Sequence, residues 1–359
     1  MTLYLDANAS EPLRPAARSA VLAALDLPGN PSSVHTAGRS ARRLLDRARD
    51  QVVARFGPAE VVFTAGGTEA NALAIRGLAA GRRVLVGATE HPAVLAAAPG
   101  ATLLPVLPDG TLDLDALAGA LHGPPALVCL MAANNETGVI HPLPDASTLC
   151  RWHGALLHVD AVQAAGRMPV SLEAFGADSL AISGHKLGGP KGAGALMLRP
   201  GLDLVPLVTG GGQERGRRGG TEPLPAIAGL GAAAEAADPA EATRLSVLRD
   251  AIEAGCHGAE VAGAGAPRLP NTTSLILPGH AAETQVIALD LAGMQVSAGA
   301  ACSSGKVGRS HVLAAMGLAE GAIRVSLPWD APPDAAERFV QAWSAMRDRL
   351  SRRVLAGAR

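Results

Sequence analysis

Short apolar runs separated by helix-like stretches fill the first two-thirds of the chain. Between the runs, apolar residues recur at helical spacing, for example over 69–78 and 114–121. Strands that alternate with helices predict an α/β fold, with a largely parallel sheet covered by helices on both faces. Ligands bind such sheets beyond the carboxyl ends of the strands. The runs that predict buried strands lie at 61–63, 84–86, 103–106, 126–130, 156–159 and 179–182.

The pattern changes after a glycine- and arginine-rich stretch at 209–221. Ala-rich helical segments follow at about 225–237 and 239–254, and the residues beyond Pro270 predict a smaller α+β unit. We therefore expect a large domain over 13–240 and a small domain formed by 1–12 together with 241–359. The elements expected in the smaller unit are strands at 273–277, 296–298 and 323–326 and a helix at 282–291.

Composition narrows the class of protein. The 359 residues are 48% hydrophobic, enough for two domains whose cores need no disulfides. The 31 basic and 32 acidic residues nearly cancel, which argues against direct binding of nucleic acid and against a polybasic membrane anchor. No signal peptide, membrane-spanning run or metal-ligand spacing is evident, so we expect a cytoplasmic protein without a bound metal. The four cysteines are widely spaced and predict no disulfide framework: Cys129, Cys150, Cys256 and Cys302.

Lysine is rare, so chemistry that requires a lysine has only three candidates, Lys186, Lys191 and Lys306. Lys186 follows a predicted strand directly, within Ser183-Gly184-His185-Lys186, and the end of that strand faces the expected ligand crevice. A solvated loop lysine is the alternative interpretation, and Lys191 in the same turn is a competitor.

Two further strand ends carry candidate chemistry. Asp160 ends the run at 156–159, with Gln163 one turn later, and a carboxylate there requires a cation or hydrogen-bond donors unless it only caps the next helix. After the run at 61–63, Gly66-Gly67-Thr68 leads into a helix. Free backbone N–H groups at a helix start bind phosphate, although an ordinary capped turn has the same residues.

An anion site, a carboxylate and a lysine at the ends of strands of one sheet match the needs of pyridoxal phosphate. Its phosphate suits a helix start, its aldehyde forms an imine with a lysine, and a carboxylate keeps its ring nitrogen protonated. The residues therefore predict pyridoxal phosphate as cofactor.

Motifs along nearly the whole chain strengthen this interpretation. The sequence resembles the cysteine desulfurases of the class V aminotransferase family, in particular their first subgroup, which are fold-type-I pyridoxal-phosphate enzymes. Ser183 to Lys186 and His158 to Gln163, in this order, are the most specific of the matches. The other matching segments are 4–9, 30–35, 68–71, 89–91, 134–138 and 215–221.

The resemblance implies a role for each site residue. Lys186 links to the cofactor, Asp160 pairs with the ring nitrogen, and Gln163 donates to the ring hydroxyl. His91 stacks on the ring and moves protons at the substrate sulfur. The residues that hold the phosphate are Gly67, Thr68, Ser183 and His185, joined by Thr221 from the other subunit of a homodimer. The residues that hold the substrate carboxylate are Asn135 and Arg324, and a planar guanidinium suits that task.

Cys302 distinguishes a desulfurase from its relatives. It lies among small residues with no apolar periodicity, so we expect a mobile, accessible loop, whereas the other three cysteines lie in strand-like or helical patterns and suit buried positions. The resemblance implies that Cys302 takes sulfur from L-cysteine as a persulfide, leaving L-alanine. It also implies a sulfur acceptor, either a scaffold for iron–sulfur clusters or a tRNA-thiolation enzyme.

Some features differ from the family. Pro328-Trp329 stands where relatives usually have glycine and arginine, and the C-terminal tail does not resemble the family's scaffold-docking end. Two alternatives therefore remain open. One is another class V activity, such as selenocysteine lyase, aminotransferase or lyase, and the other is a non-catalytic protein that binds the cofactor and acts as a partner.

Overall fold

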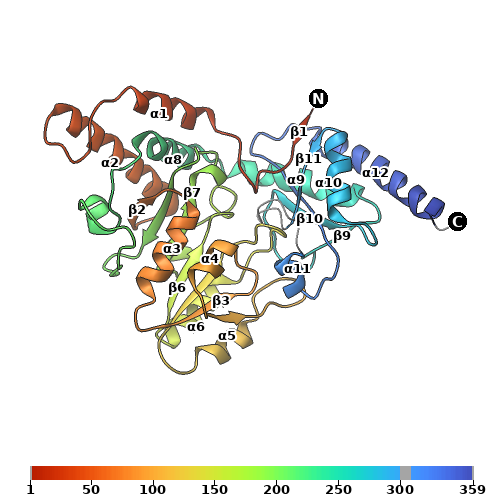
Figure 1. Cartoon of the computed structure of the whole chain (residues 1–359), viewed down its shortest axis with the longest axis horizontal. Helices are drawn as coiled ribbons and strands as arrows, with labels where there is room; N and C mark the ends of the chain where they lie inside the picture. The colour runs from red at the N-terminus through yellow and green to blue at the C-terminus, as the bar shows by residue number, and fades with distance from the viewer. Residues whose placement is uncertain (1, 300–308, 358–359) are drawn as a thin grey trace.

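A seven-stranded sheet forms the centre of the larger part of the molecule in the computed structural model, which describes residues 2–299 and 309–357 (Figure 1). Its strand order is β2-β8-β7-β6-β5-β3-β4. Six strands run in the same direction, and only β8 is antiparallel to its neighbours β2 and β7. The strands are β2 (Glu60–Thr64), β3 (Arg83–Gly87), β4 (Thr102–Leu104), β5 (Ala126–Met131), β6 (Leu156–Asp160), β7 (Ser179–Ser183) and β8 (Gly194–Leu198).

Helices cover both faces of this sheet, as expected. Alternate strand residues point to opposite faces, so Val61 and Phe63 belong to one hydrophobic cluster and Val62 to another. The cluster around Val62 includes residues of α3 (Gly67–Leu78) and α4 (Pro92–Ala97). The opposite cluster takes residues from α1 (Pro15–Leu25), α2 (Thr36–Phe56), α5 (Leu114–Leu121), α6 (Leu143–Trp152), α7 (Leu172–Phe175) and α8 (Leu224–Ala236). The α/β fold class is therefore confirmed.

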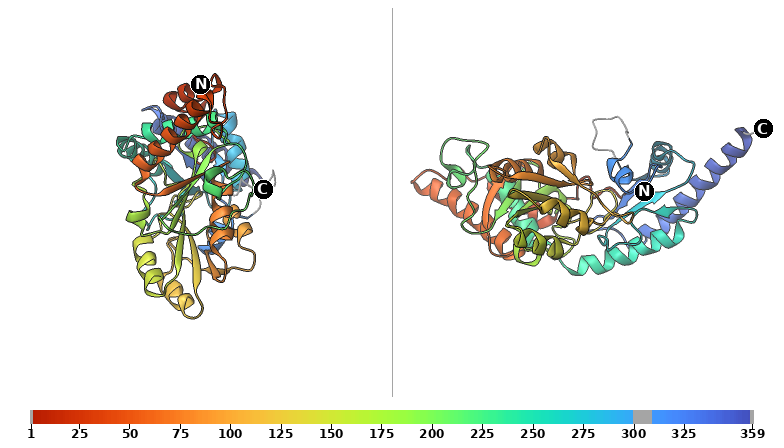
Figure 2. Two further views of the ribbon diagram at one scale, coloured as in Figure 1. Left: turned by 90° about the vertical axis from the view of Figure 1, so that its left-hand side faces the viewer. Right: turned by 90° about the horizontal axis from the view of Figure 1, so that it is seen from below.

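The smaller part contains an antiparallel four-stranded sheet in the order β12-β13-β10-β9. The strands are β9 (Glu260–Val261), β10 (Thr272–Ile276), β12 (Ser297–Ala298) and β13 (Ile323–Ser326). The N-terminal β1 (Leu3–Tyr4) pairs in parallel with β11 (Met294–Gln295). The helices here are α9 (Ala240–Gly255), α10 (Ala282–Leu291), α11 (His311–Ala315) and α12 (Ala335–Gly357). Figure 2 shows the end of α12 extending away from the body.

The two parts have separate hydrophobic cores. The core clusters of the large sheet draw on residues between 17 and 237, plus Leu269. The core of the smaller part joins Leu3 and Leu5 to residues from Leu245 to Met346. The first residues of the chain thus pack with residues of the last third. The boundary near residue 240 stays a prediction.

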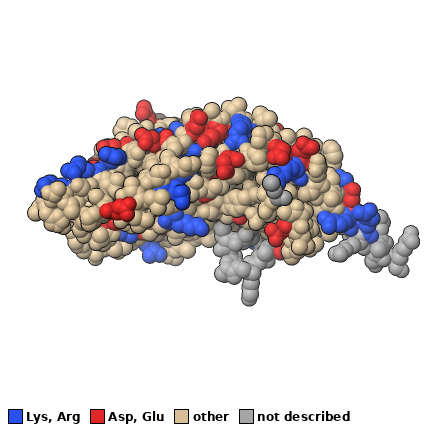
Figure 3. Space-filling view, turned by 90° about the horizontal axis from the view of Figure 1, so that it is seen from above, with Lys and Arg blue, Asp and Glu red and all other residues tan. Residues whose placement is uncertain are grey.

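The surface carries charges of both signs. On the face shown in Figure 3, basic and acidic side chains are interspersed. Among the described residues, no helix has the length and apolar character that crossing a membrane requires.

Candidate active site

Side chains from three strand ends of the large sheet converge on one cavity of about 870 Å³. Gly66 and Gly67 follow β2, Asp160 ends β6, and Lys186 follows β7. The parallel direction of these strands places their carboxyl ends at the same edge of the sheet. The predicted site residues that line the cavity are Gly67, Thr68, His91, Asn135, Asp160, Gln163, Ser183, His185 and Lys186.

One end of the cavity has the features of an anion site. The 12-residue helix α3 begins at Gly67 without a side-chain cap, so its first N–H groups have no partner within the helix. A Cβ at Gly67 would lie 2.6 Å from Val162 Cγ2, which is why only glycine fits here. Ser183 Oγ and His185 Nδ1 are buried and have no hydrogen-bond partner. These groups together fit the phosphate of the expected cofactor.

Asp160 lies deep in the cavity and is held from two sides. Its carboxylate accepts hydrogen bonds from Asn71 Nδ2 at 2.6 Å and from the Val162 backbone N–H at 2.9 Å. Burial raises the pKa of Asp160, whereas these donors and the nearby His91 and Lys186 lower it. A buried carboxylate that is held by neutral donors and lines the cavity fits a protonated ring nitrogen.

A chain of hydrogen bonds behind Asp160 fixes its orientation. His158 Nε2 lies 2.9 Å from Asn71 Oδ1, and His158 Nδ1 lies 2.8 Å from Ser179 Oγ. Because the Asn71 amide donates through Nδ2 to Asp160, its oxygen accepts and His158 carries its proton on Nε2. Burial lowers the pKa of His158 to about 3, so the ring stays neutral at physiological pH.

The buried His158 predicts a pH-dependent stability. Between about pH 6.5 and pH 3, His158 is protonated in the unfolded chain but neutral in the folded chain. The free energy of unfolding therefore decreases as the pH falls through this range. Glutamine at this position does not titrate. The destabilisation caused by His158→Gln should therefore shrink by about 1.4 kcal/mol per pH unit below 6.5. Urea unfolding of both proteins at pH 7 and pH 5 measures this difference, and a difference independent of pH would contradict it.

Lys186 projects from a short 3₁₀ turn, η1 (Gly184–Lys186), directly after β7. Its ammonium donates to the backbone oxygens of Asn8 and, at 3.0 Å, of Ala9. The competitor Lys191 also lines the cavity but is exposed to solvent. Lys306 lies outside the described residues. Of the two described lysines, only Lys186 is partly buried beside Asp160.

Gln163 and His91 occupy two further sides of the cavity. Gln163 Nε2 donates to Asn8 O at 3.0 Å. His91 precedes α4, and its Nδ1 accepts from the Ala93 N–H at 3.1 Å, which leaves the proton of a neutral ring on Nε2. Desolvation lowers the pKa of His91, while the nearby Asp160 raises it. The net lowering favours the neutral ring, which can accept or release a proton.

The two expected carboxylate ligands lie next to each other, although only Asn135 lines the cavity. Arg324, on β13, is 2% exposed and donates to the Asn135 backbone oxygen at 3.1 Å. Its other amino group pairs with Asp6 at 2.7 Å, and its Nε has no partner. The guanidinium is thus held in place behind Asn135 by a carboxylate of the N-terminal segment.

Two expected site residues are not part of this cavity in a single chain. Thr221 is exposed, in the segment after the 3₁₀ turn η2 (Gln213–Gly216), and does not line the cavity. Its expected role requires a second subunit. Cys302 lies outside the described residues.

The other three cysteines are buried, as the sequence predicts. Burial raises the pKa of Cys150 and of Cys256 to about 12, and that of Cys129 well above its usual range. A protonated thiol is a poor nucleophile, so none of the three suits sulfur chemistry. Among the described residues, no group of three or more metal-ligating side chains comes together.

Sequence reasoning gave no role to several residues that hold the site. Asn71 and His158 lie within recognised motifs, but their contact with Asp160 depends on the packing of α3 against the sheet. Arg167 lies four positions after Gln163 in the turn that follows β6, and this spacing was the available signal. Its Nη1 donates to Gln163 Oε1, and its Nη2 pairs with Glu11 at 2.8 Å.

Comparisons with known proteins agree with this geometry. The model of the family Aminotransferase class-V matches residues 3–339. A cysteine desulfurase of Cereibacter sphaeroides is 42% identical over 372 residues, covering 97% of this chain and 96% of that protein. The X-ray structure of a NifS-like protein from Rickettsia africae ESF-5 has a TM-score of 0.90 and 31% identity, covering 97% of this chain and 100% of that one. A structure of SspA in complex with cysteine has a TM-score of 0.81 and 30% identity, with 91% and 99% coverage.

Proposed function

The chain belongs to the aminotransferase class-V family, and from this membership we propose that it is a cysteine desulfurase. The enzyme removes sulfur from L-cysteine and leaves L-alanine. One observation carries the proposal: Lys186, Asp160 and the unpartnered polar groups beside the start of α3 converge on one cavity. Similarity to a cysteine desulfurase at 42% identity over nearly the full chain supports the same activity.

Pyridoxal phosphate is the cofactor, and the cavity suits each of its parts. When bound, it supplies an electron-withdrawing ring that acidifies the α-carbon of an attached amino acid. The start of α3, with Ser183 and His185, would hold the phosphate, and Asp160 would hold the ring nitrogen. Lys186 would supply the covalent link.

Side chains of the protein would bind the substrate and transfer its protons. Lys186 would take the proton from the α-carbon of the substrate. Asn135 and Arg324 orient the substrate carboxylate, with Asp6 keeping the guanidinium in its plane. His91 covers the ring face and moves a proton at the substrate sulfur, a role suited to a neutral imidazole.

Cys302 accepts the sulfur. Its thiolate attacks the sulfur atom of L-cysteine, so that a new S–S bond forms while the bond between sulfur and the β-carbon breaks. The electron pair of the broken bond stays with the carbon, which gains a proton and leaves as alanine. The products are one alanine and one persulfide, which balances one cysteine and one thiol.

A homodimer and a sulfur acceptor complete the proposal. Thr221 is exposed, as it must be to reach the phosphate site of a second subunit. The acceptor would be a scaffold for iron–sulfur clusters or a tRNA-thiolation enzyme, in the cytoplasm. The large domain would comprise 13–240, and the small domain, with the Cys302 loop, 1–12 and 241–359.

Product analysis tests the activity. With L-cysteine and a reductant, the purified protein should release alanine and sulfide in equal amounts. Selenocysteine, serine and alanine are the comparison substrates, because another class V enzyme would prefer one of these. A cofactor absorbance band that L-cysteine leaves unchanged would contradict the proposal and favour a non-catalytic binding protein.

A further inference from the structure

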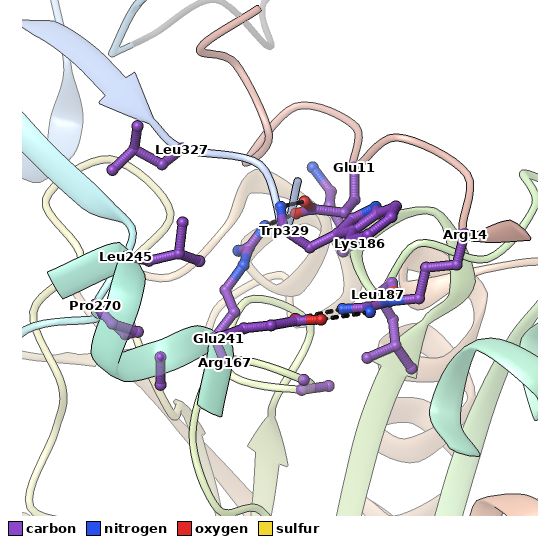
Figure 4. A pocket seen from close by; sticks show the side chains of 13 residues that line it. Glu11, Arg14, Arg167, Lys186, Leu187, Glu241, Leu245, Pro270, Leu327 and Trp329 are labelled. Carbon is purple, nitrogen blue, oxygen red and sulfur yellow. Dashed lines mark hydrogen bonds and ion pairs between the residues drawn. The ribbon is translucent and has the colours of Figure 1, made fainter. Parts of the chain in front are cut away.

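A buried polar cluster behind the cavity has no part in the chemistry described so far. It consists of Glu11, Arg167 and Trp329, which lie beside Lys186 in Figure 4. Glu11 Oε2 pairs with Arg167 Nη2 at 2.8 Å, and both side chains are only 5% exposed. Glu11 Oε1 accepts the Trp329 backbone N–H at 2.6 Å. The cluster joins the N-terminal segment, the large-domain loop after β6 and the segment after β13.

Arg167 connects this cluster to the cavity through Gln163. Its Nη1 donates to Gln163 Oε1 at 2.5 Å and to the Gln163 backbone oxygen at 3.2 Å. Because a guanidinium can only donate, this contact determines which end of the amide is oxygen. Nε2 is then the end that donates to Asn8 O, and its second hydrogen is left for a ligand in the cavity that Gln163 lines.

We propose that Glu11 and Arg167 are positioning residues that fix the amide of Gln163 as a donor toward the cofactor. The inference rests on the proposed function, because the ligand is the ring hydroxyl of pyridoxal phosphate. Without Arg167, only the bond from Gln163 Nε2 to Asn8 O opposes a 180° turn of the amide, and the turned amide would present its oxygen to the ring oxygen. Two facing acceptors repel each other, so the hydrogen bond is lost.

Glu11 is needed because Arg167 is buried. An unpaired guanidinium in this position would be strongly unfavourable, and the carboxylate both neutralises it and sets its plane. Trp329 in turn holds Glu11 through its backbone N–H, while its indole Nε1 donates to Pro12 O at 2.9 Å. The Arg14 guanidinium lies 4.9 Å from the centre of the indole ring. The departure from the family at Pro328-Trp329 therefore belongs to the same cluster.

The test uses the double variant Glu11→Gln/Arg167→Met in the cofactor-loaded enzyme. Removing both charges together avoids leaving one of them buried alone, and glutamine keeps an acceptor for the Trp329 N–H. Losing the donor from Gln163 should weaken the binding of pyridoxal phosphate about tenfold. It should also raise by about one pH unit the pH at which the visible band of the bound cofactor changes, because the ring oxygen holds a proton more strongly without a donor.

Two further variants make the result specific. Arg167→Lys retains a donor for Gln163 Oε1. Its spectral shift should therefore be at most half of the shift that the double variant shows. Glu253→Gln/Arg268→Met removes a partly buried ion pair of 2.6 Å whose side chains do not line the cavity, and it should leave the spectrum unchanged.

Three outcomes overturn the proposal. A double variant that binds pyridoxal phosphate and titrates like the wild type would show that Gln163 does not depend on the cluster. A control pair with the same shift would show general destabilisation. A wild-type protein that forms no cofactor band would refute the proposed function itself, and the inference with it.

Discussion

Replacing Lys186 by alanine should lower the turnover of L-cysteine by about 10⁴-fold or more, because one side chain supplies both the link to the cofactor and the base at the α-carbon. No other described residue can take over both tasks. Asp160 has no amino group, and Lys191 is exposed at the rim of the cavity. The measurement is the release of alanine from L-cysteine under saturating pyridoxal phosphate.

Chemical trapping tests directly which lysine carries the covalent link to the cofactor. Borohydride reduction of the wild-type enzyme should attach the cofactor to the peptide that contains Lys186. Lys191→Ala, from the same turn, is the matched control and should label like the wild type. Label on Lys191 or Lys306, or a Lys186→Ala protein that retains normal turnover, would refute the assignment.

Replacing Cys302 by alanine should lower alanine release by about 10³-fold or more while cofactor binding is retained. Sulfur transfer requires a thiolate, and Cys302 is the remaining candidate by chemistry. Burial raises the pKa of Cys150 and Cys256 to about 12, so almost none of either thiol is ionised at neutral pH. Cys129 lies in the centre of β5 with no exposed surface.

Cys256→Ala is the control for this experiment, since it removes a thiol from the hydrophobic core of the smaller part of the molecule. It should leave persulfide formation intact and lower only stability, by about 1 kcal/mol for the lost packing. Mass spectrometry after a single turnover locates the extra sulfur atom. An extra 32 Da on Cys256 or Cys150, instead of Cys302, would contradict the prediction.

The fold was predictable where the pattern is local. The runs at 156–159 and 179–182 became β6 and β7 with one residue added to each, because buried parallel strands consist of continuous apolar residues. The strand expected at 103–106 ends at Leu104, since Pro105 has no N–H to continue the ladder. Strand β8 was not predicted, because its residues include no β-branched side chain and it forms only by pairing with β2 and β7.

The sequence predicted the reactive side chains of the site but not the residues that hold them in place. Lys186 and Asp160 stand at strand ends, so topology alone brings them to one edge of the sheet. The residues that hold the site in place make contacts between segments far apart in the sequence. The ion pair between Asp6 and Arg324 joins residues 318 positions apart, and the hydrogen bond from the Trp329 N–H to Glu11 spans the same separation. No periodicity within a sequence reports such contacts.

The N-terminal segment bonds to residues more than 300 positions further along the chain, which affects when it can fold during synthesis on the ribosome. The Leu5 backbone oxygen accepts the Ser326 N–H, and the Ala7 N–H donates to the Ser326 oxygen. Asn8 and Ala9, which bind the Lys186 ammonium, lie directly after these contacts. A nascent chain can therefore build its large sheet early, but it cannot place its first residues until Ser326 has been synthesised. The surroundings of Lys186 are therefore completed only after the strand that contains Ser326 has been made.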